Sequence, residues 1–410
     1  MAPSASGPKA GLDRLQAQGK RVLVRVDFNV PLTPDGAPRD DSRLRAALPT
    51  IQELRRGGAA VVLMTHLGRP PGRPVRGLST RVLVGPLEGL LQAPVAWVDQ
   101  TSGPEVVRRT KELGPGQVLL LENLRFDPGE TRNDPAFAAR LAELGDVYVN
   151  DAFAAAHRAH ASTEGVAHLL PAYAGRLMEL ELAQLGAVLK DPRRPLMAVV
   201  GGSKLSTKLE LLGSLLELVD TLCLGGAMAA TFLKAADLEV GRSLVEDQFL
   251  DRALALVADA SKRRVDLRLP RDVVVAEAVD APASRVRVVA VEEIPADTMI
   301  LDIGPETISG WEQLVREAGT VVWNGPLGLY ENPLFAKGTE RLARAVAASP
   351  AHSVTGGGDL QAAIHRLHLS DRLTHVSTGG GATLEFLQGR QLPGVVALPD
   401  AEAVASGPRQ

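Results

Sequence analysis

The chain contains a single cysteine, Cys223, among its 410 residues, which excludes an internal disulfide framework and a cysteine-based metal cluster. Cys223 lies in the apolar run 221–224, so we expect a buried structural thiol rather than a nucleophile. The sequence also lacks an uninterrupted apolar run of about 18 residues, the length that a membrane span needs. Its polar N-terminus, residues 1–11, has no apolar signal-peptide core. These absences predict a cytoplasmic protein with no membrane partner.

The chain also lacks a strong excess of charge of either sign. Its formal net charge of −3 argues against nonspecific nucleic-acid binding as the main function. With 45% hydrophobic and 23% charged residues, the composition is that of a globular protein. Because 410 residues exceed the size of one ordinary hydrophobic core, we expect two domains.

Short Val/Leu-rich runs alternate with helical patterns along the chain, which is typical of βαβ units and parallel sheets. The expected elements include helices over Ser42–Arg56 and Lys204–Leu218, and strands over Val273–Ala276 and Met299–Asp302. An amphipathic helix over Met178–Lys190 ends at a proline-rich stop, where we place the domain junction. The predicted fold class is α/β, with two Rossmann-like domains, each a mostly parallel sheet flanked by helices, joined by a hinge helix. The predicted domains are residues 1–185 and 186–389, with the tail 390–410, frayed at residues 405–410, packing back on the first domain.

Polar and cationic side chains follow the predicted strands of the first half. In open α/β sheets ligands bind beyond the carboxyl ends of the strands. Arginine and histidine side chains that converge there indicate a small anion, a phosphate or a carboxylate. The alternative is a core network of hydrogen-bonded His and Arg residues. The side chains in question are Asp27, Asn29, Arg43, His66, Arg69, Arg125, Asp151, His157, Arg158 and His160.

Glycines follow the predicted strands of the second half, and repeated glycine turns favour a ligand that the backbone approaches closely, such as a nucleotide. In the segment 197–210 a strand is followed by two glycines and then by Lys204 and Lys208, which we expect in the first turn of a helix. Cations at a helix start oppose the helix dipole unless a polyphosphate binds there. An ordinary strand–turn–helix with solvated lysines is the alternative, and the spacing is not that of a Walker A loop. Asp359 is either a helix N-cap or a Mg²⁺ ligand beside nucleotide phosphates.

In this order, the strand-end motifs resemble those of phosphoglycerate kinase, over nearly the whole chain. The resemblance implies two Rossmann-like domains with a hinge, a monomer, and a glycolytic enzyme that uses Mg²⁺ and ATP/ADP. The motifs are RVDFNVPL (Arg25–Leu32), RLRAALPTI (Arg43–Ile51), HLGRP (His66–Pro70), LLENLRF (Leu120–Phe126), YVNDAFAAAHRAHAST (Tyr148–Thr163), GGSKLSTK (Gly201–Lys208), GGAMAATFLKA (Gly225–Ala235), DIGPET (Asp302–Thr307), VWNGPLG (Val322–Gly328), GGGD (Gly356–Asp359) and STGGGATLEFL (Ser377–Leu387).

The resemblance also implies roles for the matching residues. It implies that 3-phosphoglycerate is held by Asp27, Asn29, Arg43, His66, Arg69, Arg125 and Arg158. It implies that the nucleotide is bound by Gly202, Ser203, Lys204, Lys208, Gly225, Gly226, Asn324, Pro326, Glu331, Gly357, Gly358, Asp359, Gly379 and Gly381. Arg43, Lys204 and Gly380 would act catalytically, and Asp359 would hold the Mg²⁺ ion. The chain departs from the family pattern at Leu360, Ala154, Ala155 and Ser203, and none of these departures removes a charge.

The expected reaction is reversible, Mg²⁺-dependent phosphoryl transfer from ATP to 3-phosphoglycerate, a phosphotransfer to a carboxylate that gives ADP and 1,3-bisphosphoglycerate. A two-lobed, non-catalytic binding protein for a phosphorylated small molecule is the alternative, but it would leave Lys204 without a task. Catalysis through a phosphohistidine on His157 or His160 would need a partnering base that the sequence does not indicate. An NAD-dependent dehydrogenase would need a G-x-G-x-x-G motif after an early strand, which is absent.

Overall fold

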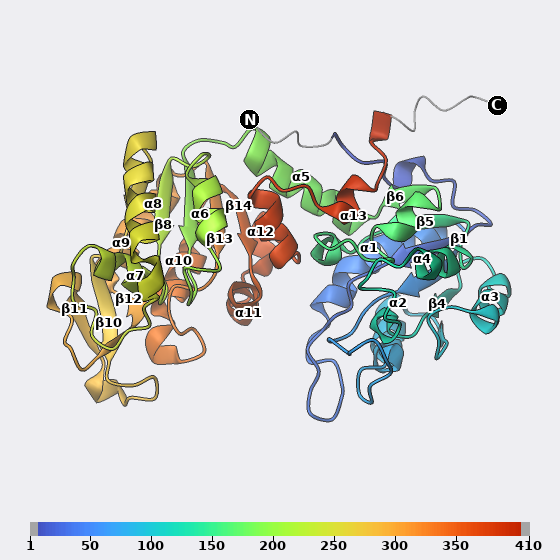
Figure 1. Cartoon of the computed structure of the whole chain (residues 1–410), viewed down its shortest axis with the longest axis horizontal. Helices are drawn as coiled ribbons and strands as arrows, with labels where there is room; N and C mark the ends of the chain where they lie inside the picture. The colour runs from blue at the N-terminus through green and yellow to red at the C-terminus, as the bar shows by residue number, and fades with distance from the viewer. Residues whose placement is uncertain (1–6, 403–410) are drawn as a thin grey trace. The chain divides into compact units, whose positions relative to one another are not determined.

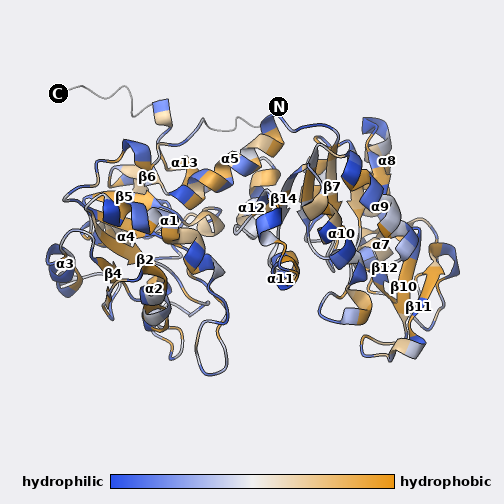
Figure 2. Ribbon diagram, turned by 180° about the vertical axis from the view of Figure 1, so that it is seen from behind, coloured by the Kyte–Doolittle hydropathy of each residue, from blue (hydrophilic) through white to orange (hydrophobic). Residues whose placement is uncertain are grey.

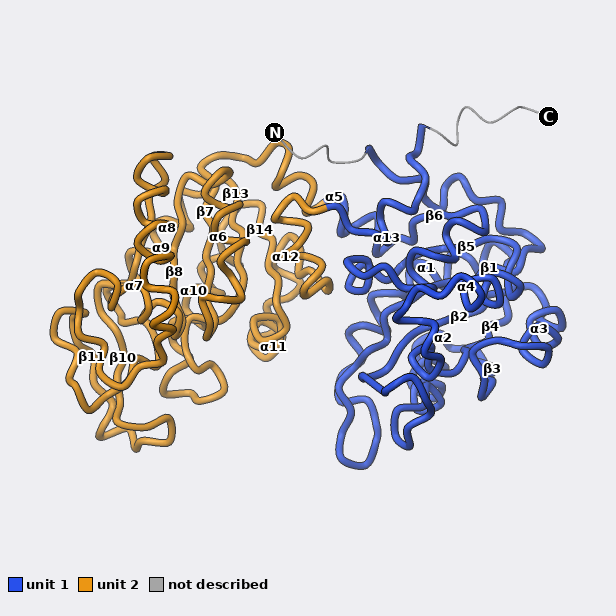
Figure 3. Tube along the Cα trace, viewed as in Figure 1, with its two compact units in different colours: residues 1–183, 391–410 blue, residues 184–390 orange. Residues whose placement is uncertain are grey.

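The computed structural model describes residues 7–402 (Figure 1). The chain divides into two compact units, coloured separately in Figure 3. Unit 1 consists of Met1–Ala183 and Gln391–Gln410, and unit 2 consists of Gln184–Arg390. Within residues 7–402, no helix is both long enough and apolar enough to cross a membrane.

Unit 1 is built around a six-stranded parallel sheet with the strand order β3-β4-β2-β1-β5-β6. The central strands are almost wholly buried, which is expected for a parallel sheet covered on both faces. The strands are β1 (Arg21–Arg25), β2 (Ala60–Met64), β3 (Val95–Trp97), β4 (Val118–Leu120), β5 (Val147–Asn150) and β6 (Ala172–Ala174).

Amphipathic helices flank this sheet. On the first of them, α1, the buried residues Leu44, Ala47, Ile51 and Leu54 recur every three or four positions and form one apolar stripe. Figure 2 shows this arrangement, with hydrophobic strands inside and hydrophilic helix faces outside. The helices of unit 1 are α1 (Ser42–Arg56), α2 (Val84–Leu91), α3 (Pro104–Lys111), α4 (Pro135–Ala142) and α13 (Pro393–Val396).

The end of the described chain packs against unit 1. The backbone amide of Ala10 donates to the carbonyl of Pro399 (2.9 Å), and the side-chain amide of Asn150 at the end of β5 donates to the carbonyl of Gly394 (3.1 Å). The segment around α13 therefore completes the environment of β5. Residues 405–410, which the sequence predicts to be frayed, lie outside the described residues.

Unit 2 contains a second six-stranded parallel sheet, with the strand order β15-β14-β13-β7-β8-β9. The predicted α/β fold class, with a parallel sheet flanked by helices in each half, is therefore confirmed. The sheet strands are β7 (Leu196–Val200), β8 (Thr221–Leu224), β9 (Asp266–Arg268), β13 (Thr320–Asn324), β14 (His352–Gly356) and β15 (His375–Val376). The helices are α6 (Leu209–Leu215), α7 (Ala229–Ala235), α8 (Leu250–Arg263), α9 (Pro305–Glu317), α10 (Lys337–Ala348), α11 (Gly358–Arg366) and α12 (Gly381–Leu387).

Three strands of unit 2 form a separate antiparallel sheet instead of joining the parallel one. Strand β10 (Asp272–Ala276) pairs antiparallel with both β11 (Arg287–Ala290) and β12 (Met299–Ile303). The sequence predicts β10 and β12 but assigns both to the βαβ alternation, because it does not reveal the intervening β11. Strand β11 is half exposed and begins with an arginine, so it carries only a weak strand signal.

The helix predicted over Lys204–Leu218 is wrong at its start. Helix α6 begins only at Leu209, and residues 203–208 form bends and turns. The Glu246 carboxylate accepts hydrogen bonds from the backbone amide (2.9 Å) and the hydroxyl (2.6 Å) of Ser206. Lys204 therefore lies before the helix rather than in its first turn, and Lys208 takes the N-cap position of α6.

Helix α5 (Arg176–Lys190) runs across the boundary between the two units. Its first residue, Arg176, donates to both carboxylate oxygens of Glu53 on α1, at 2.8 and 2.7 Å. Bidentate arginine–carboxylate pairs are geometrically specific, so this pair orients the start of the helix on unit 1.

Candidate active site

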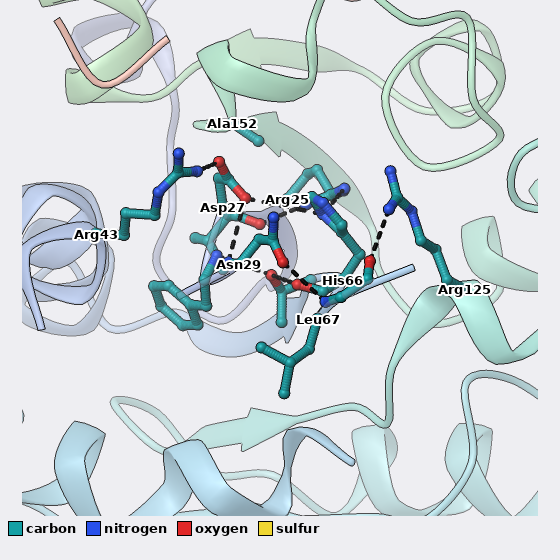
Figure 4. A network of polar contacts seen from close by, with 12 residues as sticks. Arg25, Asp27, Asn29, Arg43, His66, Leu67, Arg125 and Ala152 are labelled. Carbon is teal, nitrogen blue, oxygen red and sulfur yellow. Dashed lines mark hydrogen bonds and ion pairs between the residues drawn. The ribbon is translucent and has the colours of Figure 1, made fainter. Parts of the chain in front are cut away.

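Four parallel strands of unit 1 bring the predicted anion-binding residues to one edge of the sheet. Strands β1, β2, β4 and β5 run in the same direction, so the residues that follow them emerge at the same side. Asp27 and Asn29 follow β1, His66 follows β2, Arg125 follows β4, and Arg158 follows β5. Figure 4 shows most of these side chains gathered in one polar network.

The buried carboxylate of Asp27 organises the first part of this network. Arg43, near the start of α1, forms an ion pair with Asp27 Oδ2. Asp27 Oδ1 accepts a hydrogen bond from the backbone amide of Asn29 (3.3 Å). Asn29 Oδ1 in turn accepts from the amide of Gly68 (2.8 Å), and Arg125 Nη1 donates to the carbonyl of the same glycine (2.7 Å). The loops after β1 and β2 are thereby fixed to each other and to Arg125.

The positive charge of this cluster exceeds what its two buried carboxylates, Asp27 and Glu130, balance. Burial together with the neighbouring Arg158, Arg25 and Arg69 lowers the pKa of Arg125 to about 10, although Glu130 acts to raise it. His66 is 6% exposed, and burial together with Arg25, Arg125, Arg43 and Arg158 holds the pKa of its imidazole well below 6.5. Like charges that depress one another's pKa values gain most from a bound anion, so this edge is suited to a phosphate or a carboxylate.

Arg69 and Arg158 lie at the periphery of the cluster. Arg69 is exposed in the loop after β2, close enough to Arg125 to influence the pKa of that residue. Arg158 Nε donates to Nε2 of His157 at 3.1 Å. Of the other histidines and acids that the sequence highlights, His160 lies 3.7 Å from Glu130 and Asp151 binds the start of α5.

In unit 2 the strand ends gather Lys208, Asn324 and Asp359. The Lys208 ammonium donates to Asn324 Oδ1, and Asn324 Nδ2 donates to the carbonyl of Gly356 at the end of β14 (2.9 Å). Burial lowers the pKa of Lys208, and the nearby Asp359 raises it. Asp359 is exposed in the first turn of α11, so a carboxylate, an ammonium and an amide face the same region.

The glycines of unit 2 fall into two groups. Gly226 adopts φ +69°, and a Cβ there would lie 2.5 Å from the backbone nitrogen and oxygen of Gly202. A Cβ at Gly201 would lie 2.1 Å from the carbonyl oxygen of Pro326. These strand-end turns therefore pack backbone to backbone, which already requires glycine. Gly358 has open space where a Cβ would be, so packing does not account for it, whereas Gly380 also has open space but adopts φ +53°, which by itself favours glycine.

The remaining predicted nucleotide residues are exposed or line these turns. Ser203 and Lys204 are exposed in the turns before α6, and Lys204 is near enough to lower the pKa of Glu246. Glu331 is exposed next to Tyr330. Burial, Asp359 and Glu331 together raise the pKa of Tyr330, so these two acids share one neighbourhood. Tyr330 lies outside the sequence motifs.

A divalent cation has one suitable protein ligand at this edge of unit 2. Mg²⁺ is usually held by one or two carboxylates and by phosphate oxygens of the substrate. Asp359 supplies one exposed carboxylate beside Lys208 and Asn324. Among residues 7–402 no cluster of three or more His, Cys, Asp or Glu side chains could hold an ion by itself. This donor set fits a Mg²⁺ ion that arrives with a nucleotide, and not a permanent metal centre.

Three buried residues of unit 1 belong to the cluster although the sequence reasoning assigned them no role. Arg25, at the end of β1, is 1% exposed, and Glu130 and Ser162 are fully buried. The sequence signal is weak, because β1 has an arginine at each end, Arg21 and Arg25, around three apolar residues. Glu130 and Ser162 lie more than 100 residues from Arg25 in the sequence. No motif spacing therefore indicates that the three side chains meet.

Comparisons with known proteins agree with this architecture. The family model described as phosphoglycerate kinase matches residues 12–390. A phosphoglycerate kinase of Rubrobacter xylanophilus is 54% identical over 396 residues, covering 97% of this chain and all of that protein. One of Moorella thermoacetica is 52% identical, covering 96% of this chain and 99% of that protein.

Solved structures agree as well. The phosphoglycerate kinase of Coxiella burnetii matches with a TM-score of 0.86 and 41% identity, covering 98% of this chain and 100% of that one. The enzyme of Pyrococcus horikoshii matches with a TM-score of 0.82 and 31% identity, covering 97% and 99%. Because the family model and the relatives each span nearly the whole chain, the chain belongs to the phosphoglycerate kinase family.

Proposed function

We propose that unit 1 holds 3-phosphoglycerate and unit 2 holds the nucleotide in the reaction that family membership gives this chain. That reaction is the reversible transfer of a phosphoryl group between ATP and the carboxylate of 3-phosphoglycerate, a step of glycolysis. The observation that carries this assignment is the contrast between the two strand edges. One has clustered cations around Asp27 and His66, and the other has glycine turns with Lys208, Asn324 and Asp359.

On the unit 1 side, the substrate has two negatively charged groups, a phosphate and a carboxylate. Arg69, Arg125 and Arg158 supply guanidinium groups that match phosphate geometry. Arg43, His66 and Asn29 would complete the site, with Asp27 holding Arg43 in place. Because the cations at this edge already lower one another's pKa values, binding the anionic substrate relieves repulsion as well as forming hydrogen bonds.

On the unit 2 side, Lys204 and Lys208 would contact the nucleotide phosphates, and the glycine turns would lie against the adenosine. The backbone around Gly202, Gly225, Gly226, Asn324, Pro326 and Glu331 would shape that pocket, with Ser203 beside it. The residues proposed near the phosphates are Gly357, Gly358, Asp359, Gly379, Gly380 and Gly381. Open space at Gly358 supports a close approach of a ligand to the backbone there.

The chemistry requires positioning and charge neutralisation more than acid–base catalysis, because the phosphoryl group itself is the transferred electrophile. When bound, Mg²⁺ would neutralise charge on the nucleotide phosphates, and Asp359 is the carboxylate that we propose holds it. Lys204 and Arg43 would stabilise the negative charge on the oxygens of the group in flight. Gly380 would present its backbone to the same group.

A transfer between substrates held by different units requires those units to reach a productive, in-line arrangement. We propose that α5 and the segment that follows it, as far as Pro195, act as the hinge, since α5 contributes residues to both units. The proposal includes a monomeric, cytoplasmic enzyme, in keeping with the family.

Two measurements test this assignment. A coupled assay should show ATP-dependent consumption of 3-phosphoglycerate by the purified chain. Calorimetry with each ligand alone should then give a crossed pattern, in which Arg43→Ala weakens 3-phosphoglycerate binding only and Lys208→Ala weakens nucleotide binding only. If both substitutions weaken the same ligand, the division of substrates between the units is wrong.

A further inference from the structure

A chain of buried hydrogen bonds leads from Glu130 to the ring of His66. The Ser162 hydroxyl lies 2.6 Å from Glu130 Oε1, and the Ser162 backbone amide lies 3.0 Å from Glu130 Oε2. Arg25 Nε lies 2.8 Å from the same hydroxyl, and Arg25 Nη2 lies 3.1 Å from Nδ1 of His66. All four side chains are at least nine-tenths buried, so bulk water does not compete for these hydrogen bonds.

The direction of each hydrogen bond follows from the chemistry of its partners. A guanidinium has donors only, so Arg25 must donate both to Ser162 Oγ and to His66 Nδ1. The single hydroxyl proton of Ser162 then points to Glu130, whose two oxygens accept hydrogen bonds from the Ser162 hydroxyl and the Ser162 backbone amide. Nδ1 of His66 therefore keeps its lone pair, and the ring proton resides on Nε2.

The other group near His66 Nδ1 does not reverse this assignment. Asp27 Oδ1 lies 3.8 Å from Nδ1, beyond hydrogen-bond distance, and its partner oxygen is engaged by Arg43. The charged groups that face His66 are Arg25 from β1, Asp27 after it, Arg43 from α1, Arg125 from the loop after β4 and Arg158 from the loop after β5. Four cations against one carboxylate oppose a further proton on the ring.

We propose that Glu130, Ser162 and Arg25 are positioning residues that hold His66 as the neutral tautomer protonated on Nε2. Within residues 7–402 no protein acceptor for Nε2 is found, so this N–H is left for a ligand. This inference rests on the proposed function, in which His66 contacts 3-phosphoglycerate. His66 then acts as an uncharged hydrogen-bond donor to the substrate, and only the arginines contribute charge.

One consequence is that the binding of 3-phosphoglycerate does not depend on the protonation of His66 between about pH 6 and pH 8. An imidazole with an ordinary pKa would titrate in that range and would make substrate affinity fall as the pH rises. A neutral, locked donor gives a flat profile, apart from the titration of the substrate phosphate itself.

The tautomer can be measured directly on the full-length, ligand-free protein. Nitrogen NMR of ¹⁵N-histidine-labelled enzyme, with His66→Gln used to assign the signal, should show an unprotonated Nδ1 and a protonated Nε2 from pH 6 to pH 8. A protonated Nδ1, or a doubly protonated ring in that range, overturns the proposal. Because no ligand is present, this outcome is independent of whether the substrate assignment is right.

Addition of 3-phosphoglycerate to the same sample tests the tautomer of His66 and the proposed substrate site separately. A shift of the Nε2 signal, with Nδ1 still unprotonated, supports both the locked tautomer and the proposed site. If 3-phosphoglycerate binds without moving either nitrogen, the donor role of His66 is overturned even though the tautomer stands. If it does not bind at all, the proposed function fails instead.

A series of variants tests whether the buried hydrogen bonds from Glu130 to Arg25 determine the tautomer of His66. Ser162→Ala removes the link between Arg25 and Glu130, and we expect a mixture of His66 tautomers and a several-fold higher KM for 3-phosphoglycerate with kcat little changed. Ser162→Thr restores the hydroxyl and should restore both readouts. Ser79→Ala is the matched control, because Ser79 donates to the carboxylate of Glu122 in the same unit but does not contact Arg25 or His66. An unchanged tautomer in a folded Ser162→Ala protein overturns the role of Ser162.

Discussion

The Asp151 carboxylate is hydrogen-bonded to the backbone of Leu177. Its Oδ1 accepts hydrogen bonds from the Leu177 amide at 2.9 Å and from the adjacent Met178 amide at 3.2 Å. Both amides belong to the first turn of α5, which has no intrahelical acceptors for them. Asp151 directly follows β5, so this cap ties the sheet of unit 1 to the helix that continues into unit 2. An aspartate in the motif VNDAF, between predicted ligand residues, is thus a helix cap.

The buried cap should make stability depend on pH. Burial raises the pKa of Asp151 from 3.8 to about 7, against hydrogen bonds from Thr50, Met178 and Leu177 that lower it. Between these values the folded protein keeps a proton that the unfolded chain releases, so stability falls as pH rises from about 4 to about 7. The change for this group is up to about 4 kcal/mol.

Urea unfolding of wild type and Asp151→Asn at several pH values checks this dependence. The variant cannot ionise, so its free energy of unfolding should fall less steeply between pH 4 and pH 7. Asp302→Asn is a useful comparison in unit 2, since burial raises the pKa of Asp302 to about 7 as well and its carboxylate also accepts a backbone amide, from Gly338 at 2.8 Å. Identical slopes in wild type and Asp151→Asn would contradict the raised pKa.

The sequence predicted those features that local patterns determine. Helix α1 over Ser42–Arg56 has the bounds expected from its apolar period, and the motifs alone indicated the family. It did not predict what depends on distant partners. Ser206 binds Glu246 in the segment before α6, and Ser162 and His66 accept hydrogen bonds from the buried Arg25. Contacts between residues far apart in the sequence produce no periodic pattern from which they could be predicted.

Two arginines on the same turn of α1 offer a matched test of the anion site. Arg43 pairs with buried Asp27, whereas Arg45 pairs with Asp41 on the exposed surface. Arg43→Ala should raise the KM for 3-phosphoglycerate by about 10- to 100-fold. This range corresponds to the loss of a hydrogen bond to a charged group, which contributes roughly 1.5–3 kcal/mol. Arg45→Ala should change it less than about two-fold, because exposed ion pairs contribute little. Steady-state kinetics with MgATP held saturating measures both, and equal effects would place the anion elsewhere.

Asp359 should determine how much Mg²⁺ the enzyme needs. Replacement by asparagine removes the one carboxylate proposed to hold the ion. The Mg²⁺ concentration for half-maximal activity should therefore rise at least about ten-fold. Asp371→Asn is the control, since Asp371 is exposed in the same unit in the short helical turn Ser370–Arg372. Activity is titrated with Mg²⁺ at fixed ATP, and an unchanged titration curve for Asp359→Asn would exclude it as the ligand.

Lys204 is the strictest test of the mechanism, because the structure leaves its side chain exposed in a turn before α6 and not in a helix. Such an ammonium contributes little to the ligand-free fold, so Lys204→Ala should unfold at the same urea concentration as wild type. If Lys204 stabilises the phosphoryl group in flight, kcat should fall by about 100- to 1,000-fold, with a much smaller change in KM for ATP. Lys234→Ala, which removes an exposed lysine paired with Asp247, should leave kcat unchanged. Near-normal turnover in Lys204→Ala would mean that Arg43 and the nucleotide-bound cation suffice for charge neutralisation, and that Lys204 has no catalytic role.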